Sequence, residues 1–259
     1  MKALSKYKFV MISIFSFIIF LVIWQLVTDV YRVVPAHSLP SPVRVAGSFI
    51  NKLTDTRPDG ATLPQHIIAS LTVALTGFIV ASLVGIPLGI LMAWKEKADL
   101  FLRPPFDLFR SIPALGWIPV IILFFGIGLT ANATVIFIAA LIPITINTYA
   151  GIKSANPVHM WVAQTFGASN WQLLRKVALP SAFPLIFAGL RQSLNISWMA
   201  LVAAELLAAR RGLGYLIQMS RDFARVDLII VGMLTIGGIG TLLAALLRFI
   251  EEKYVKGGV

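Results

Sequence analysis

Long apolar blocks separated by short polar segments make up most of the chain. A helix needs about 20 residues, at a rise of 1.5 Å each, to cross the roughly 30 Å of hydrocarbon in a bilayer. The pattern therefore predicts an all-α, polytopic membrane protein. Six transmembrane helices are expected over residues 9–27, 67–94, 106–127, 134–152, 185–209 and 228–250.

The first apolar block has a second interpretation. Lys2, Lys6 and Lys8 precede it, as basic residues precede the apolar segment of a signal peptide. The block is longer than the roughly 7–15 residues usual there, and no clear small-x-small cleavage site directly follows it. The longest segment between blocks, residues 31–65, is too short for another soluble domain, so residues 1–259 are expected to form a single transmembrane domain.

Composition supports the membrane assignment. The chain is 58% hydrophobic and 13% charged, whereas soluble domains are about half apolar and about a quarter charged. A formal charge of +11 often indicates nucleic-acid binding. Here the basic residues are scattered between apolar blocks, which is typical of the loops of membrane proteins. No nucleic-acid partner is expected.

The distribution of basic residues predicts the orientation. With the N-terminus inside, 14 of the 22 Lys and Arg residues fall in inner loops or at inner helix ends. This bias predicts that both termini are cytoplasmic. The basic residues left outside, among them Arg210 and Arg211, favour an anionic solute or an acidic face on a partner that delivers it.

Two further patterns concern helix packing. Gly77, Ala81, Gly85 and Gly89 recur every four residues, which predicts a face where another helix can approach closely. Prolines inside the apolar blocks predict broken helices, which are typical of transporters and channels. These prolines include Pro113, Pro119 and Pro143.

No enzyme signature is present in the sequence. It has no Cys, no Gly-x4-Gly-Lys-Ser/Thr loop for ATP phosphates, and no Gly-x-Ser-x-Gly elbow. His37, His66 and His159 lie in different loops without the spacing of metal ligands. We expect no catalytic residues, no metal and no cofactor on this chain.

The inner segment at residues 153–184 carries the clearest motif. Gly167 can adopt the left-handed conformation that ends a helix, and Ser169 or Asn170 can cap the next one. Leu179-Pro180 then returns the chain to the membrane. The segment predicts a short helix, a glycine turn, a second short helix and a proline stop, arranged as a docking surface for a soluble partner.

This segment resembles the EAA loop of permease subunits of bacterial ABC importers. In that motif Gly is followed by nine residues, an aliphatic residue, one residue and Leu-Pro, and Gly167, Val177, Leu179 and Pro180 stand at this spacing. Ala163 occupies the last position of the Glu-Ala-Ala triplet, but the acidic residue is missing.

The resemblance extends along nearly the whole chain to the nitrate/sulfonate/taurine/bicarbonate group of these permeases, and looks closest to taurine and sulfonate permeases. The matching motifs are Leu39-Pro40-Ser41-Pro42, Gly85-Ile86-Pro87-Leu88-Gly89, Arg110-Ser111-Ile112-Pro113, Phe125-Gly126-Ile127-Gly128, Gly189-Leu190-Arg191, Ala204-Glu205 and Gly212-Leu213-Gly214-Tyr215.

The resemblance implies a type I ABC importer permease fold in a bacterial inner membrane. It implies a second copy of the chain, two cytoplasmic ABC ATPases that bind ATP and Mg²⁺, and an extracytoplasmic solute-binding protein. The residues expected to contact the ATPase are Thr165, Phe166, Gly167, Ala168, Ser169, Trp171, Leu174 and Pro180.

Polar and aromatic residues within the predicted spans are candidates for the solute path, because polar groups are costly in lipid. Each could instead form a helix–helix hydrogen bond or lie at the membrane interface. Glu205 is expected to pair with Arg210 or Arg211 at a gate. The candidates are Trp117, Asn147, Asn195, Ser197, Trp198, Glu205 and Arg211.

The predicted function is thus the permease of an ATP-driven importer for a small solute, expected to be an anion such as taurine, an alkanesulfonate or nitrate. An ion-coupled secondary transporter or channel is the alternative. It is disfavoured because the spans hold few ionisable residues and the inner loop would have no role.

Overall fold

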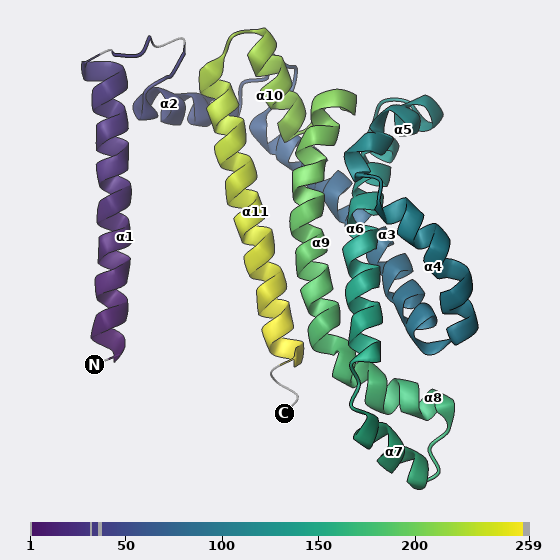
Figure 1. Ribbon diagram of the computed structural model, residues 1–259. Helices are drawn as coiled ribbons and strands as arrows, with labels where there is room; N and C mark the ends of the chain where they lie inside the picture. The colour runs from purple at the N-terminus through teal and green to yellow at the C-terminus, as the bar shows by residue number, and fades with distance from the viewer. Residues whose placement is uncertain (1, 32, 36–37, 256–259) are drawn as a thin grey trace. The chain divides into compact units, whose positions relative to one another are not determined.

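The computed structural model describes residues 2–31, 33–35 and 38–255, with side chains over 11–31, 33–35 and 38–253. These residues form helices and no strand, which confirms the all-α prediction (Figure 1). The helices are α1 (Lys2–Gln25), α2 (Pro42–Lys52), α3 (Leu63–Trp94), α4 (Glu96–Arg110), α5 (Ile118–Phe125), α6 (Leu129–Lys153), α7 (Pro157–Thr165), α8 (Asn170–Leu173), α9 (Leu179–Ala208), α10 (Leu213–Asp222) and α11 (Val226–Val255).

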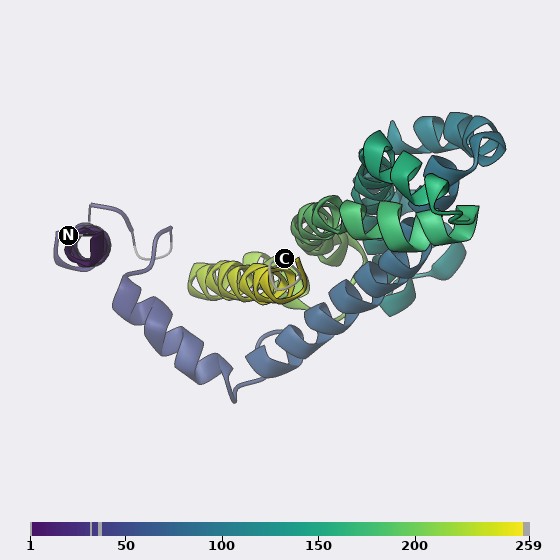
Figure 2. The ribbon, with the colours of Figure 1, turned by 90° about the horizontal axis from the view of Figure 1, so that it is seen from below.

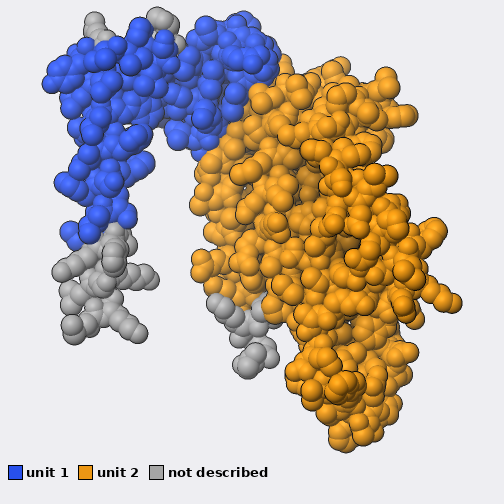
Figure 3. All heavy atoms as spheres, in the orientation of Figure 1, with its two compact units in different colours: residues 1–66, 216–235 blue, residues 67–215, 236–259 orange. Residues whose placement is uncertain are grey.

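The predicted spans correspond to five long apolar stretches and one bent pair of helices within the described residues. The stretches are Met11–Val30, Leu63–Trp94, Leu129–Lys153, Asn170–Ala208 and Val226–Lys253. The chain forms two compact units, residues 1–66 with 216–235 and residues 67–215 with 236–259 (Figure 3). The expectation of a single transmembrane domain stays a prediction.

The third span, expected over residues 106–127 with interruptions at Pro113 and Pro119, is broken at Pro113 as predicted, but not at Pro119. The chain bends by 84° between Glu96–Arg110 and Ala114–Phe125. Pro113 stands at this break, because proline has no N–H to donate and pushes the preceding residue out of the helical conformation. Pro119 falls in the first turn of α5, where no donor is needed.

Pro143 does not break its helix, contrary to expectation. α6 continues from Leu129 to Lys153. The side-chain amide of Asn147 donates to the Pro143 carbonyl at 2.8 Å. Pro143 is buried, so neighbouring helices surround α6 at this point. A break at Pro143 is therefore wrong, and tertiary packing holds the helix through it.

Helices α3, α6 and α9 supply the core of the second unit. One cluster joins Val73 and Ala74 of α3, Ile136 and Ala139 of α6, and Leu201 of α9. Both ribbon views show α6 beside α9 (Figures 1 and 2).

The small-residue face of α3 packs against α6, as predicted. A Cβ added at Gly77 would lie 2.6 Å from Ile136 Cβ and 2.7 Å from the Ala133 carbonyl oxygen. At Gly89 it would lie 2.7 Å from the Thr145 carbonyl oxygen. Backbone atoms cannot yield as a flexible side chain can, so these glycines set the distance between α3 and α6.

Replacing Gly77 by Leu should destabilise the protein by about 1–3 kcal/mol, because the new side chain must displace α6. Gly238→Ala is the matched control, since a Cβ at Gly238 meets nothing within 4 Å. Unfolding in detergent, followed by circular dichroism, measures the difference. Equal stability of the two variants would contradict the close contact.

The first unit holds two ionic clusters, one of them fully buried. Lys52 Nζ donates to the Arg57 carbonyl oxygen at 2.9 Å and to Asp59 Oδ1. His66 Nε2 lies 2.8 Å from Asp59 Oδ2, and all three side chains of Lys52, Asp59 and His66 are buried. These contacts tie the end of α2 to the start of α3.

The second cluster joins α2 to the start of α11. Ser48 Oγ donates to Asp227 Oδ2 at 2.6 Å, and Arg225 Nη2 donates to the same oxygen at 2.7 Å. Ser41 accepts from the N–H of Arg44 and caps α2. These contacts hold residues 41–62 within the first unit.

Candidate functional site

The inner loop folds as two short helices around a glycine, as expected. α7 ends at Thr165, and Gly167 has a φ of 78°, in the left-handed region that favours glycine. Ser169 caps α8: its hydroxyl accepts from the N–H of Gln172, whose side chain accepts from the N–H of Ser169.

Pro180 does not end a helix, contrary to expectation. α8 continues through a π-helical turn, Leu174–Ala178, into α9, where Pro180 lies in the first turn. Proline is tolerated in the first turn, and π-helical turns accommodate irregular hydrogen bonding. The loop therefore connects directly to the long helix α9, whose start at Leu179 precedes the predicted start at residue 185.

Exposed aromatic side chains distinguish this loop. Phe166 is 88% exposed and Trp171 is 66% exposed. Thr165, Gly167, Ser169 and Pro180 are also exposed, and Ala168 is half-buried.

Leu174, expected on the loop surface, is instead buried. It packs with Ala93 of α3, Ile152 of α6, and Ala178 and Ile186. α8 thus presents Trp171 outward, and Leu174, the first residue of the π-helical turn that follows, is anchored inward. Of the residues expected to contact the ATPase, Leu174 is the one that the structure places in the core.

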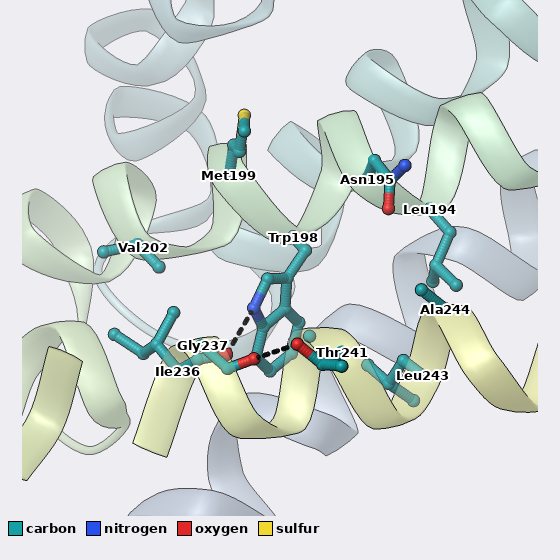
Figure 4. Close-up of a pocket in the computed structure, with 11 residues that line it drawn as sticks. Leu194, Asn195, Trp198, Met199, Val202, Ile236, Gly237, Thr241, Leu243 and Ala244 are labelled. Carbon is teal, nitrogen blue, oxygen red and sulfur yellow. Dashed lines mark hydrogen bonds between the residues drawn. The ribbon is translucent and has the colours of Figure 1, made fainter. Parts of the chain in front are cut away.

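A groove between α9 and α11 brings together two of the predicted path residues. The cavity of about 640 Å³ includes Asn195 and Trp198 (Figure 4). The Trp198 indole N–H donates to the Ile236 carbonyl oxygen at 3.1 Å. A Cβ at Gly240 would lie 2.8 Å from that indole nitrogen, so glycine makes room for the ring. The remaining lining residues are Leu194, Met199, Val202, Ile236, Gly237, Gly240, Thr241, Leu243 and Ala244.

The α11 side of the groove was missed by sequence reasoning, which considered only polar and aromatic residues. The group Gly237, Gly238 and Gly240 is a signal that could have indicated it, because clustered glycines mark a helix surface open to close contact.

Three other candidates lie away from this groove. Asn147 donates to the Pro143 carbonyl and to Gln192 Oε1 at 3.2 Å, a helix–helix bond. Ser197 is buried at 1% exposure. Trp117 packs on Phe109, with ring centroids 5.2 Å apart.

Glu205 does not pair with Arg210 or Arg211, contrary to expectation. Its carboxylate accepts from Ser70 Oγ at 2.7 Å and from the N–H of Gly214 at 2.8 Å. The ion pairs among the described side chains include neither arginine. Arg210 and Arg211 are both exposed.

The histidines differ in setting. His66 contacts Asp59, and His159 is exposed. His37 lies outside the described residues. The sequence-based expectation that the chain binds no metal stays a prediction.

Comparisons with known proteins agree on one family. The model for "binding-protein-dependent transport system inner membrane component" matches residues 85–256. The taurine transport system permease protein of Escherichia coli is 37% identical over 247 residues, covering 94% of this chain and 88% of that protein. The nitrate import permease protein of a Synechocystis species is 33% identical, covering 92% and 86%.

A solved structure shares the fold. A chain of the MetNI methionine ABC transporter, in an inward-facing conformation, superimposes with a TM-score of 0.62 at 21% identity. The match covers 75% of this chain and 95% of that chain. The expected type I ABC importer permease fold is confirmed.

Proposed function

The chain belongs to the family of binding-protein-dependent transport system inner membrane components, and we propose that it forms the path through which an ABC importer moves a small organic or inorganic anion. The permease role and the inner-membrane location follow from the family. The observation that carries the solute class is the similarity to taurine and nitrate permeases over most of the chain.

The partner subunits are inferred from a sequence motif that this chain does not have and from aromatic side chains that it exposes. Its sequence has no phosphate-binding loop, so ATP and Mg²⁺ belong on a partner ATPase. The exposed Phe166 and Trp171 form the contact surface for that ATPase. Two copies of the chain and two ATPases assemble with a binding protein, and both termini of the chain are cytoplasmic.

Among such anions, those that also have an apolar part fit this chain best. Arg210 and Arg211 supply positive charge at the end of α9, which raises the local concentration of anions. The groove at Asn195 and Trp198 is lined mostly by apolar side chains, which suit the carbon portion of an alkanesulfonate.

Uptake by reconstituted complexes tests this function. The permease, its ATPase and its binding protein are placed in proteoliposomes, and uptake of labelled taurine and nitrate is measured with and without ATP. We expect ATP-dependent uptake of at least one of them. Uptake driven by an ion gradient without ATP would instead support the secondary transporter.

Replacing Arg211 by Gln should raise the half-saturating concentration for an anionic solute by about three- to tenfold, because one cation is lost at the entrance. Arg44→Gln is the matched control: Arg44 is also exposed, and it takes part in none of the ion pairs among the described side chains. Uptake titrations with loaded binding protein measure both. Equal affinities for the two variants would refute the role of Arg211.

A further inference from the structure

The carboxylate of Glu205 is buried just before the turn that carries Arg210 and Arg211. Glu205 is 1% exposed and lies in the last turn of α9, which ends at Ala208. A buried carboxylate is costly unless hydrogen bonds compensate it. Its partners are the Ser70 hydroxyl and the N–H of Gly214, at 2.7 and 2.8 Å.

Ser70 links two elements through the same hydroxyl. Its Oγ donates to Glu205 Oε1 and accepts from the N–H of Leu213 at 2.8 Å. Ser70 belongs to α3, and Leu213 is the first residue of α10. The Glu205 carboxylate, the Ser70 hydroxyl and the N–H groups of Leu213 and Gly214, here called the Glu205 clasp, therefore join α3, α9 and the start of α10.

Two glycines make this arrangement possible. Gly212 has a φ of 134°, and a Cβ there would collide with the Glu205 carboxylate. At Gly214 a Cβ would lie 2.7 Å from Glu205 Cβ and 2.7 Å from the Val202 carbonyl oxygen. The backbone thus wraps around the carboxylate at a distance that only glycine allows.

The turn enclosed by these contacts is held from both ends. Asn132 Nδ2 donates to the Ala208 carbonyl oxygen at 3.3 Å, just before the turn. The clasp holds Leu213 and Gly214, just after it. Between them lie Arg210 and Arg211, with no acidic partner among the described side chains.

We propose that Glu205 and Ser70 are positioning residues for solute entry: the Glu205 clasp fixes the turn so that Arg210 and Arg211 are presented together to an arriving anion. This inference rests on the proposed import of an anion. Fixed charges bind better than mobile ones, because their ordering cost is met before the solute arrives. The clasp acts through the arginines and does not touch the solute.

A spin-label experiment tests the clasp without requiring transport. The natural chain has no Cys, so Arg211→Cys creates a single attachment site for a nitroxide. We expect a restricted spectrum in the complex, and a mobile one when Ser70→Ala or Glu205→Gln is added. In Glu205→Gln an amide N–H replaces one acceptor oxygen and faces a donor. Ser82→Ala is the control, because Ser82 Oγ donates to the Phe78 carbonyl oxygen of its own helix, at 2.8 Å.

Uptake kinetics test whether the clasp affects solute entry through Arg210 and Arg211. With taurine as the probe, Ser70→Ala should raise the half-saturating concentration by about three- to tenfold while changing the maximal rate less than about twofold. In an Arg210→Gln/Arg211→Gln background, Ser70→Ala should have no further effect on the half-saturating concentration.

Each outcome decides the inference. An unchanged spectrum in both clasp variants would overturn the positioning role. If Ser70→Ala still raised the half-saturating concentration fully in the background that lacks both arginines, Ser70 would not act through Arg210 and Arg211, and the inference would be overturned. If the natural complex imports neither taurine nor nitrate, the proposed function fails, while the spin-label result still reports on the clasp.

Discussion

Replacing Phe166 by Asp should reduce ATP-driven uptake at least about 30-fold, because it removes an aromatic anchor from the proposed contact with the ATPase. Phe166 is 88% exposed, beside the glycine turn between α7 and α8. An aromatic ring so exposed on a loop has little stabilising role in the chain itself, so its loss should affect assembly with the partner and spare folding. Aromatic residues supply much of the binding energy at protein interfaces.

The measurement combines uptake in proteoliposomes with recovery of the ATPase in pull-downs. Phe166→Leu is the matched control, since it keeps an apolar side chain and should retain most activity. Gly167→Pro is a second test of the same surface. Proline cannot adopt the φ of 78° at Gly167, and it removes the N–H that donates to the Gln164 carbonyl oxygen at 2.8 Å.

Gly47→Ala controls for loss of a glycine, because a Cβ there meets nothing within 4 Å. Normal uptake by both Phe166→Asp and Gly167→Pro would show that the loop does not couple ATP hydrolysis to transport.

Features set by local sequence could be predicted. The helical loop around Gly167 follows from a residue that tolerates positive φ and a serine that can cap the next helix. The packing face of Gly77, Gly85 and Gly89 follows from a four-residue spacing on an apolar helix. In both cases neighbouring residues contain the information.

Features set by long-range contacts could not be predicted. The effect of a proline depends on what surrounds it: Pro113 accompanies an 84° bend, whereas Pro143 lies inside a continuous, enclosed helix. The partner of Glu205 was misjudged for the same reason. The nearby arginines were the natural choice in sequence, but Ser70 is 135 residues away.

The buried cluster of Lys52, Asp59 and His66 was also not predicted from the sequence. We expect that breaking it has a large effect on stability. Asp59→Asn should destabilise the protein by about 3–5 kcal/mol, because it leaves the buried Lys52 ammonium without its counter-charge. Burial by itself would raise the pKa of Asp59, but His66 and Lys52 against its two oxygens outweigh burial and hold that pKa below its ordinary value.

The sign of the pH dependence follows. A carboxyl group whose pKa is lowered by folding stabilises the folded state at any pH above its pKa in the unfolded chain. This contribution is lost as the pH falls through its pKa in the folded protein. The natural protein should therefore lose stability below about pH 4, and Asp59→Asn should lack this part of the loss. Asp55→Asn is the matched control in the same loop, since Asp55 pairs with an arginine that is 88% exposed and should contribute little. Unfolding titrations in mixed micelles at pH 7 and at about pH 3 compare the three proteins. Equal stability of the two variants at pH 7 would show that the cluster does not hold α2 to α3.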